Sequence, residues 1–262
     1  DPEPTPPSRP LHFPPTARLI HDGIFLQAKE RGGDHYDFDA AYAAMQGYYD
    51  QFDVNWLNQE TLVNDEFAAS GYPMFSTPGE ITDTLYNLGF RVFSLSNNHS
   101  YDKGAAGIEA SMAHWAAMPD DVVTMGFYNL ETYDNYAYQT VNGITFGYLS
   151  YTEHTNGLPT PSGTDYGVVY LDDHETIAKQ IAAMRPNCDV LIVSAHMAPR
   201  HARGQRLSKG DCSVAGRPGR RCHHRHPPAC STERRMADRR KRQHNLHRLQ
   251  PGQLHQRAVL TR

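Results

Sequence analysis

The sequence predicts an α/β domain in which helices pack on a largely parallel sheet. Segments typical of buried strands alternate with segments of helical spacing between residues 19 and 196. Polar side chains follow several of these strands, at the sheet edge where α/β proteins bind ligands. The composition suits a globular protein, because 39% of the 262 residues are hydrophobic and 10% are aromatic.

The expected elements follow in chain order. Residues 38–49 show helical spacing, and residues 53–57 are typical of a short buried strand. The next helix is expected to begin at Thr77-Pro78 and to end at Gly89, since Pro suits a first turn and Gly suits the left-handed C-terminal position. Five further elements are a strand at 91–96, a helix at 107–118, a hairpin at 141–151 turning at Asn142-Gly143, a helix at 172–184 opened by a capping Asp, and a strand at 189–194.

Both ends of the chain differ in composition from this region. Residues 1–15 hold seven prolines, which predicts an extended linker, such as one that tethers a domain outside a membrane. Residues 197–262 carry 17 Lys and Arg against 3 Asp and Glu and no aromatic residue, whereas residues 1–196 have a net charge of −18. We therefore expect a Pro-rich linker at 1–18, an α/β domain at 19–196 and a basic tail at 197–262.

Several classes of protein are excluded by the same composition. No run of about 18 apolar residues is present, so no membrane span is predicted. The chain opens with Asp1 and a proline run, so no signal peptide is predicted in the sequence as given. Four cysteines are too few for a disulfide scaffold of this length.

Three polar clusters follow predicted strands and carry the candidate chemistry. Glu60 follows the first strand, Asn98 and His99 follow the strand at 91–96 with Asp102 close behind, and His196 ends the last strand. Each cluster alone is compatible with a turn or a surface charge. Together, a carboxylate, an amide oxygen and imidazoles on adjacent strand ends predict a site for one or two divalent metal ions. Two such ions can activate water and clamp a phosphoryl oxygen.

These clusters resemble motifs of the CapA family, the poly-γ-glutamate capsule biosynthesis proteins of the calcineurin-like metallophosphatase superfamily. Asn58-Gln59-Glu60-Thr61 resembles an Asn-x-Glu-Thr segment, and the run from Asn97 to Asp102 matches Asn-Asn-His-x-x-Asp. The loop Gly71-Tyr72-Pro73-Met74-Phe75 and the segment Ser194-Ala195-His196 resemble two further family motifs. The resemblance covers about two thirds of the chain and implies a layered α/β/β/α sandwich, incomplete at the C-terminus.

The resemblance also implies a role for each site residue. Glu60, Asn98 and His196 would be metal ligands. His99 would stabilise the transition state or protonate a leaving group, and Asp102 would orient its ring. The implied partners are poly-γ-glutamate or its synthesis and export machinery, at an extracytoplasmic, cell-surface or membrane-tethered location. A membrane would be contacted only through an anchor outside the sequence given.

Two departures from the family pattern lead us to expect a weak site. A Gly-Asp expected near the first strand is replaced by Thr16-Ala17-Arg18, and the later Gly-x-His-Pro-His and Tyr-Ser-Leu-Gly-Asn-Phe segments do not occur. Three remaining ligands cannot fix two ions, so we expect poor metal binding and little or no hydrolysis. We further expect 197–262 to be irregular and the sheet edge at Val190 to be exposed.

A shift of reading frame accounts for the missing C-terminal segments. Read one nucleotide later, the codons for residues 222–230 permit Val-Ile-Ile-Gly-Thr-His-Pro-His-Val. The same offset permits Tyr-Ser-Leu-Gly-Asn-Phe within 246–256 and an amphipathic helix over 204–215. We therefore interpret the residues from about 197 onward as the product of a frameshift between His196 and Gly204.

Other functions remain open at this stage. The basic run at 239–242 favours at most electrostatic, non-specific contact with nucleic acid, because no aromatic residue accompanies it. A zinc site from Cys222, His224, His226 and Cys230 has irregular spacing, and the frameshift explains these residues better. A non-catalytic module that binds an anionic surface polymer is the main alternative, because fold does not fix function.

Overall fold

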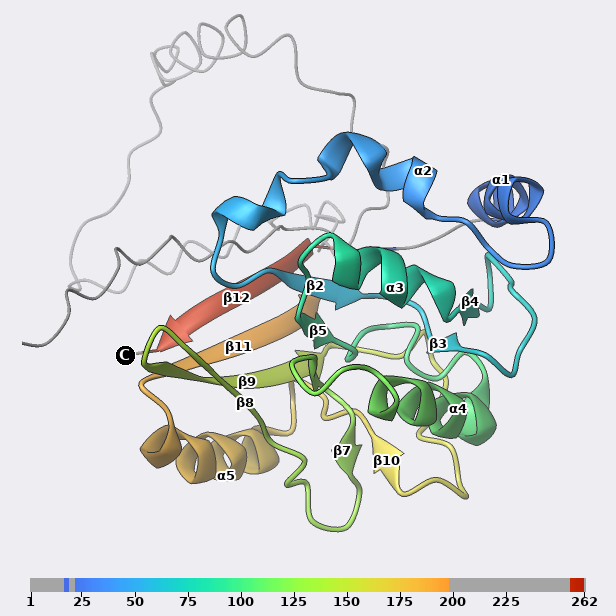
Figure 1. Ribbon diagram of the computed structural model, residues 1–262. Coiled ribbons are helices and arrows are strands. Elements are labelled where there is room, and N and C mark those ends of the chain that lie inside the picture. Colours follow the sequence, from blue (N-terminus) through green and yellow to red (C-terminus); the bar gives the residue numbers. More distant parts are fainter. Residues whose placement is uncertain (1–16, 19–21, 198–254, 262) are drawn as a thin grey trace, which may run out of the picture. The chain divides into compact units, whose positions relative to one another are not determined.

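The protein is built on two four-stranded sheets. Figure 1 shows the computed structural model, which describes residues 17–18, 22–197 and 255–261. The first sheet has the order β1-β2-β5-β6 and is parallel throughout. Its strands are β1 (Ala17–Arg18), β2 (Trp56–Gln59), β5 (Val92–Ser94) and β6 (Val123–Met125).

The second sheet is mixed and has the order β12-β11-β9-β8. Its strands are β8 (Ala137–Val141), β9 (Ile144–Thr152), β11 (Val190–Met197) and β12 (His255–Thr261). β9 and β11 run parallel, whereas β8 and β12 pair antiparallel with their neighbours. Two small pairs complete the strands: β3 (Val63–Asn64) with β4 (Thr77–Pro78), and β7 (Tyr128–Asn129) with β10 (Tyr166–Gly167).

The described residues form five α-helices beside the sheets. They are α1 (Asp22–Gly32), α2 (Asp39–Tyr42), α3 (Glu80–Asn87), α4 (Gly104–Ala116) and α5 (His174–Met184). Short 3₁₀ turns lie at Ala43–Met45, Tyr49–Gln51 and Arg185–Asn187. Among the helices that the structure describes, none is long and apolar enough to cross a bilayer.

Three apolar clusters hold these layers together. Because successive strand residues point to opposite faces, Leu57 and Phe93 pack with helical side chains while Trp56 and Val92 face the second sheet. Ile192 lies in the same inter-sheet cluster as Trp56. The outer face of the second sheet packs on α5 through a third cluster that includes Leu149, Leu191 and Met184. The structure is therefore an α/β fold with the layer order α/β/β/α.

Local sequence explains where several helices and turns end. Gly89 has φ of +92° directly after the C-terminus of α3, as the sequence predicted. Asp173 caps α5, where its side chain accepts a hydrogen bond from the Thr176 N–H at 3.1 Å. Asn142 and Gly143 both have positive φ in the two-residue turn between β8 and β9.

Two expectations about local structure are wrong. The segment 38–49 is not one helix: α2 ends after one turn, and Gly47 adopts φ of +73°, which a continuous helix does not allow. Thr77-Pro78 forms β4 instead of the first turn of α3, which begins at Glu80. The backbone of Thr77 there donates to the Leu62 carbonyl at 2.9 Å, so pairing with the β3 region overrides the helix-start signal.

Two expectations about the second sheet also need correction. Strand β11 was expected beside the strands that end near Leu57 and Ser96, but it lies in the other sheet and pairs with β9. The edge of β11 is not exposed, because β12 pairs with it from Leu191 to Met197. Residues 198–254, on which most of the frameshift interpretation depends, lie outside the described part of the chain.

Candidate functional site

The site lies where the carboxyl ends of β2, β5 and β11 converge between the two sheets. Glu60 comes directly after β2, Asn98 lies in the loop after β5, and His196 is near the end of β11. His196 Nε2 lies 2.9 Å from Asn98 Oδ1 and 3.6 Å from Glu60 Oε1. The structure thus brings together the three residues that the sequence predicted as metal ligands.

Glu60 has an unusual environment for a carboxylate. Its side chain is 1% exposed, and neither carboxylate oxygen accepts a hydrogen bond from any residue that the structure describes. Burial raises the pKa of Glu60 from 4.5 to about 7, although the positive charge of His99 lowers it in part. A buried carboxylate without donors is costly, and a cation is the natural partner that such a group accepts.

His196 is deprotonated near neutral pH. Burial lowers its pKa from 6.5 to about 4, and the charges of His154 and His99 add to this effect. Its Nδ1 atom makes no hydrogen bond within the described part of the chain, and the residue is 1% exposed. A neutral imidazole is the form that binds metal, and the ring nitrogen that faces Asn98 and Glu60 is Nε2.

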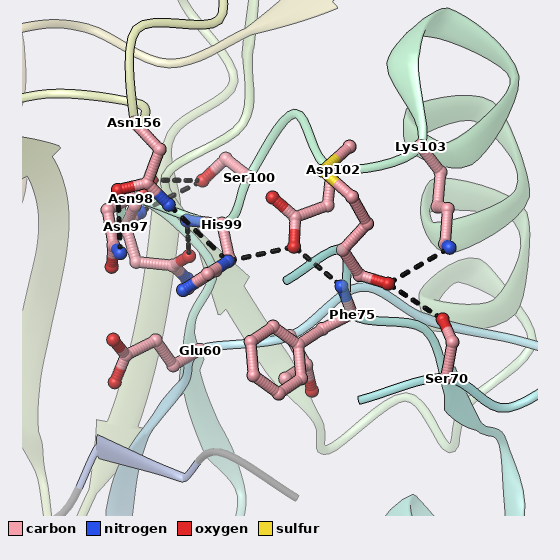
Figure 2. Close-up of polar contacts among 12 residues, drawn as sticks. Glu60, Ser70, Phe75, Asn97, Asn98, His99, Ser100, Asp102, Lys103 and Asn156 are labelled. Carbon is pink, nitrogen blue, oxygen red and sulfur yellow. Dashed lines mark hydrogen bonds and ion pairs between the residues drawn. The ribbon is translucent and has the colours of Figure 1, made fainter. Parts of the chain in front are cut away.

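His99 and Asp102 form a polar pair next to Asn98 and Glu60, as Figure 2 shows. His99 Nδ1 lies 2.8 Å from Asp102 Oδ2, and the backbone N–H of Phe75 donates to the same oxygen at 2.7 Å. The Phe75 ring packs edge-on against the His99 imidazole with a centroid distance of 4.7 Å. A carboxylate that accepts from Nδ1 fixes the tautomer in which Nε2 is available for proton transfer.

Asn97 and Ser100 shape the loop that carries these groups. The Asn97 side chain donates to the Gln59 carbonyl at 2.9 Å, and its Oδ1 accepts from the His99 N–H at 2.9 Å. Ser100 Oγ accepts from the Asn97 N–H at 2.9 Å. Asn97 therefore forms the turn and ties the loop to the end of β2. The neighbouring Asn98 points to His196 instead.

Hydroxyl groups also join the two sheets near the site. Ser94 Oγ of β5 lies 2.6 Å from Ser150 Oγ of β9 and 3.2 Å from Ser194 Oγ of β11. This polar bridge replaces apolar packing at the strand ends and fixes the distance between the sheet that carries Asn98 and the sheet that carries His196.

Two residues near the site were not singled out from the sequence. Asn156 accepts a hydrogen bond from Asn98 Nδ2 at 3.2 Å, and His154 contributes to the lowered pKa of His196. The Asn-Gly pair at 156–157 is a turn signal that could have drawn attention to this loop. Nothing in its spacing indicates that the turn would reach the loop after β5.

The donor set suits one ion better than two. Within the described residues, no three His, Cys, Asp or Glu side chains are arranged so that they could hold one metal ion. The amide oxygen of Asn98 brings the converging donors to three: one carboxylate, one imidazole and one amide. Such a set is compatible with a single divalent cation, which would satisfy the unpaired oxygens of Glu60.

Comparison with known proteins identifies the family. The profile described as "Bacterial capsule synthesis protein PGA_cap" matches residues 17–207, which is more than half of the chain. The chain belongs to the PGA_cap family. All five predicted site residues lie inside the matched segment. The match includes the short strand β1 at its beginning and extends past the end of β11.

Curated relatives of the PGA_cap chain carry consistent names. This chain is 27% identical over 143 residues to "PGA biosynthesis protein CapA" of Bacillus subtilis (strain 168). The alignment covers 54% of this chain and 37% of that protein. The chain is 26% identical over 125 residues to "Capsule biosynthesis protein CapA" of Bacillus anthracis, with 46% and 30% covered. The aligned part thus spans only 37% and 30% of the length of these two relatives.

Proposed function

We propose that this chain acts in poly-γ-glutamate capsule biosynthesis through a metal-dependent, phosphatase-like site. The observation that carries the proposal is the environment of Glu60, whose buried carboxylate lies 3.6 Å from His196 Nε2 and accepts no hydrogen bond from the described residues. The printed name of the Bacillus subtilis relative supports the biological setting. The implied location is extracytoplasmic, at the cell surface or tethered to the membrane.

The residues of the site divide into two roles. Glu60, Asn98 and His196 would hold the cation, which when bound supplies a Lewis acid for a phosphoryl-type oxygen and for water. As an imidazolium, His99 would give its Nε2 proton to a leaving group while its Nδ1–H continues to donate to Asp102. Phe75 keeps Asp102 in place through its backbone N–H, so that the imidazole keeps its orientation.

The proposed activity is weak in this chain. Two-metal hydrolysis needs both ions held with open positions for water and substrate, and three donors serve one ion. The sequence has no aspartate at the position of Thr16-Ala17-Arg18 and no His-Pro-His pair in its written frame. We therefore expect binding of a single ion with low affinity and slow hydrolysis.

A second candidate is a binding module for the anionic polymer itself. It is favoured by the absence, among the described residues, of a group of three acidic, His or Cys ligands. In this case poly-γ-glutamate, or the machinery that makes and exports it, would be bound and not cleaved. The two candidates differ in whether turnover of an ester substrate requires a metal ion.

One experiment tests the proposal and separates the candidates. Protein stripped with a chelator would be titrated with Mn²⁺ or Zn²⁺ and then assayed for bis-p-nitrophenyl phosphate hydrolysis. Glu60→Gln would be compared with Glu66→Gln, the same change at an exposed position. We expect chelator-sensitive turnover that Glu60→Gln abolishes and Glu66→Gln leaves unchanged. Polymer binding that persists in chelator, without turnover in any loaded sample, would support the binding module instead.

A further inference from the structure

Asn156 lies in a tight turn in the segment between β9 and β10. Asn156 and Gly157 have φ of +54° and +79°, and the Leu158 N–H donates to the Thr155 carbonyl at 2.9 Å. Two successive residues with positive φ define a type I′ turn, for which Asn-Gly is the favoured pair. The backbone of the turn therefore follows directly from its two central residues.

The turn is held firmly on both sides. Thr155 Oγ1 donates to the Leu158 carbonyl at 2.6 Å and lies 2.9 Å from the hydroxyl of Tyr170. Just before the turn, the Glu153 N–H donates to the His196 carbonyl at 2.9 Å. The loop that presents Asn156 is thus attached to the strand that carries His196.

The side chain of Asn156 extends from this turn to the loop after β5, as Figure 2 shows. Its Oδ1 accepts a hydrogen bond from Asn98 Nδ2 at 3.2 Å. The oxygen of the same Asn98 amide lies 2.9 Å from His196 Nε2, which also lies 3.6 Å from Glu60 Oε1. An amide rotated by 180° would turn its NH₂ group toward His196 and place two oxygens against each other at Asn156.

We propose that Asn156 is a positioning residue that holds the Asn98 amide with its oxygen toward Glu60 and His196. The functional consequence rests on the proposed metal site, since an amide binds a cation through oxygen and not through its NH₂ group. Hydrogen-bond partners of metal ligands contribute about 10- to 100-fold to metal affinity. The Asn156 side chain contacts the predicted metal ligand Asn98 at 3.2 Å, and its Nδ2 makes a longer contact of 3.5 Å with His99 Nδ1, which is not among the predicted ligands.

The chain offers a matched control for this proposal. Asn142 and Gly143 form the other Asn-Gly turn, with φ of +52° and +77°, in the hairpin that joins β8 and β9. Asn142→Gly therefore makes the same backbone change as Asn156→Gly outside the site. Gly tolerates positive φ, so both variants should fold. Asn156→Asp keeps an oxygen acceptor for Asn98 in a residue that also tolerates this conformation.

Two measurements decide the question. The side-chain amide resonances of Asn98 in metal-free protein report its hydrogen bond directly, and Mn²⁺ titration reports the affinity. For Asn156→Gly we expect the Asn98 resonances to shift and the affinity to fall about 10- to 100-fold. Asn156→Asp should keep the hydrogen-bonded resonance, and Asn142→Gly should match the wild type in both measurements.

Failure of this inference is distinguishable from failure of the proposed function. Unchanged Asn98 resonances in Asn156→Gly would overturn the positioning role, whatever the metal does. Equal losses in Asn142→Gly and Asn156→Gly would also overturn it, because they would reflect general loosening of turns. Wild-type protein that binds no metal would refute the proposed metal site, while the resonances would still decide the role of Asn156.

Discussion

Replacing Glu60 by Gln should stabilise the metal-free protein while destroying its capacity to bind metal. The carboxylate is buried and accepts no hydrogen bond from the described residues, so its ionised form is disfavoured in the folded state. Gln has nearly the shape of protonated Glu and a similar demand for hydrogen bonds. The substitution therefore removes the cost of ionisation and little else.

The magnitude follows from the pKa of Glu60, which burial raises from 4.5 to about 7. A folded-state pKa above the unfolded value means that stability falls as pH rises through this window. Near pH 8 Glu60 is ionised in both the folded and the unfolded protein, and its burial lowers the free energy of unfolding by about 3 kcal/mol. Near pH 5 the folded state is neutral and the penalty is below about 1 kcal/mol. The gain from Glu60→Gln should therefore grow with pH.

The assay is urea unfolding of chelator-treated wild type, Glu60→Gln and Glu66→Gln at both pH values. His196 is present in all three proteins, so its own titration cancels in the comparison. Added metal should stabilise only the proteins that keep Glu60, by about 2.7 kcal/mol at 100 times the dissociation constant. Near pH 8, wild type with added metal and Glu60→Gln would then have nearly equal free energies of unfolding. A free energy of unfolding for Glu60→Gln equal to wild type at both pH values would refute the reasoning.

Three other substitutions test parts of the fold and the polar pair of the site. Asp173→Ala removes the cap of α5 and should cost about 1 kcal/mol in urea unfolding; no loss would show that the Thr176 N–H finds another acceptor. Gly126→Ala should lower the free energy of unfolding by at least about 2 kcal/mol. Gly126 has a φ of +113°, and an added Cβ would lie 2.6 Å from the Ser96 backbone nitrogen. Unchanged stability would contradict this close approach. Asp102→Asn should shift the Nδ1–H proton resonance of His99 upfield and leave Mn²⁺ affinity unchanged, whereas loss of metal would place Asp102 among the ligands.

The sequence predicted the fold class, and it predicted which polar side chains lie together, because both depend on local signals. Gly89 ends α3 and Asn142-Gly143 turns the β8–β9 hairpin, since each residue has a backbone preference that neighbours do not override. Glu60, Asn98 and His196 follow strands and so gather at the carboxyl ends of the sheets.

What the sequence did not predict depends on contacts between distant segments. The membership of β11 in a second sheet is decided by its pairing with β9 and by the cluster that joins Ile192 to Trp56. Periodicity identifies a buried strand but not its neighbour. Likewise, nothing local in the 156–157 turn indicates contact with Asn98. The helical spacing at 38–49 did not produce one helix: α2 ends at Tyr42, and Gly47 adopts a positive φ further along the segment.

The central claim is that Glu60, Asn98 and His196 form a site for a single divalent cation. The most direct test is titration of chelator-stripped protein with Mn²⁺, with free Mn²⁺ followed by electron paramagnetic resonance. We expect one weakly bound equivalent in the wild type and in Glu66→Gln, and none in Glu60→Gln. Two equivalents in the wild type, or one equivalent retained by Glu60→Gln, would contradict it.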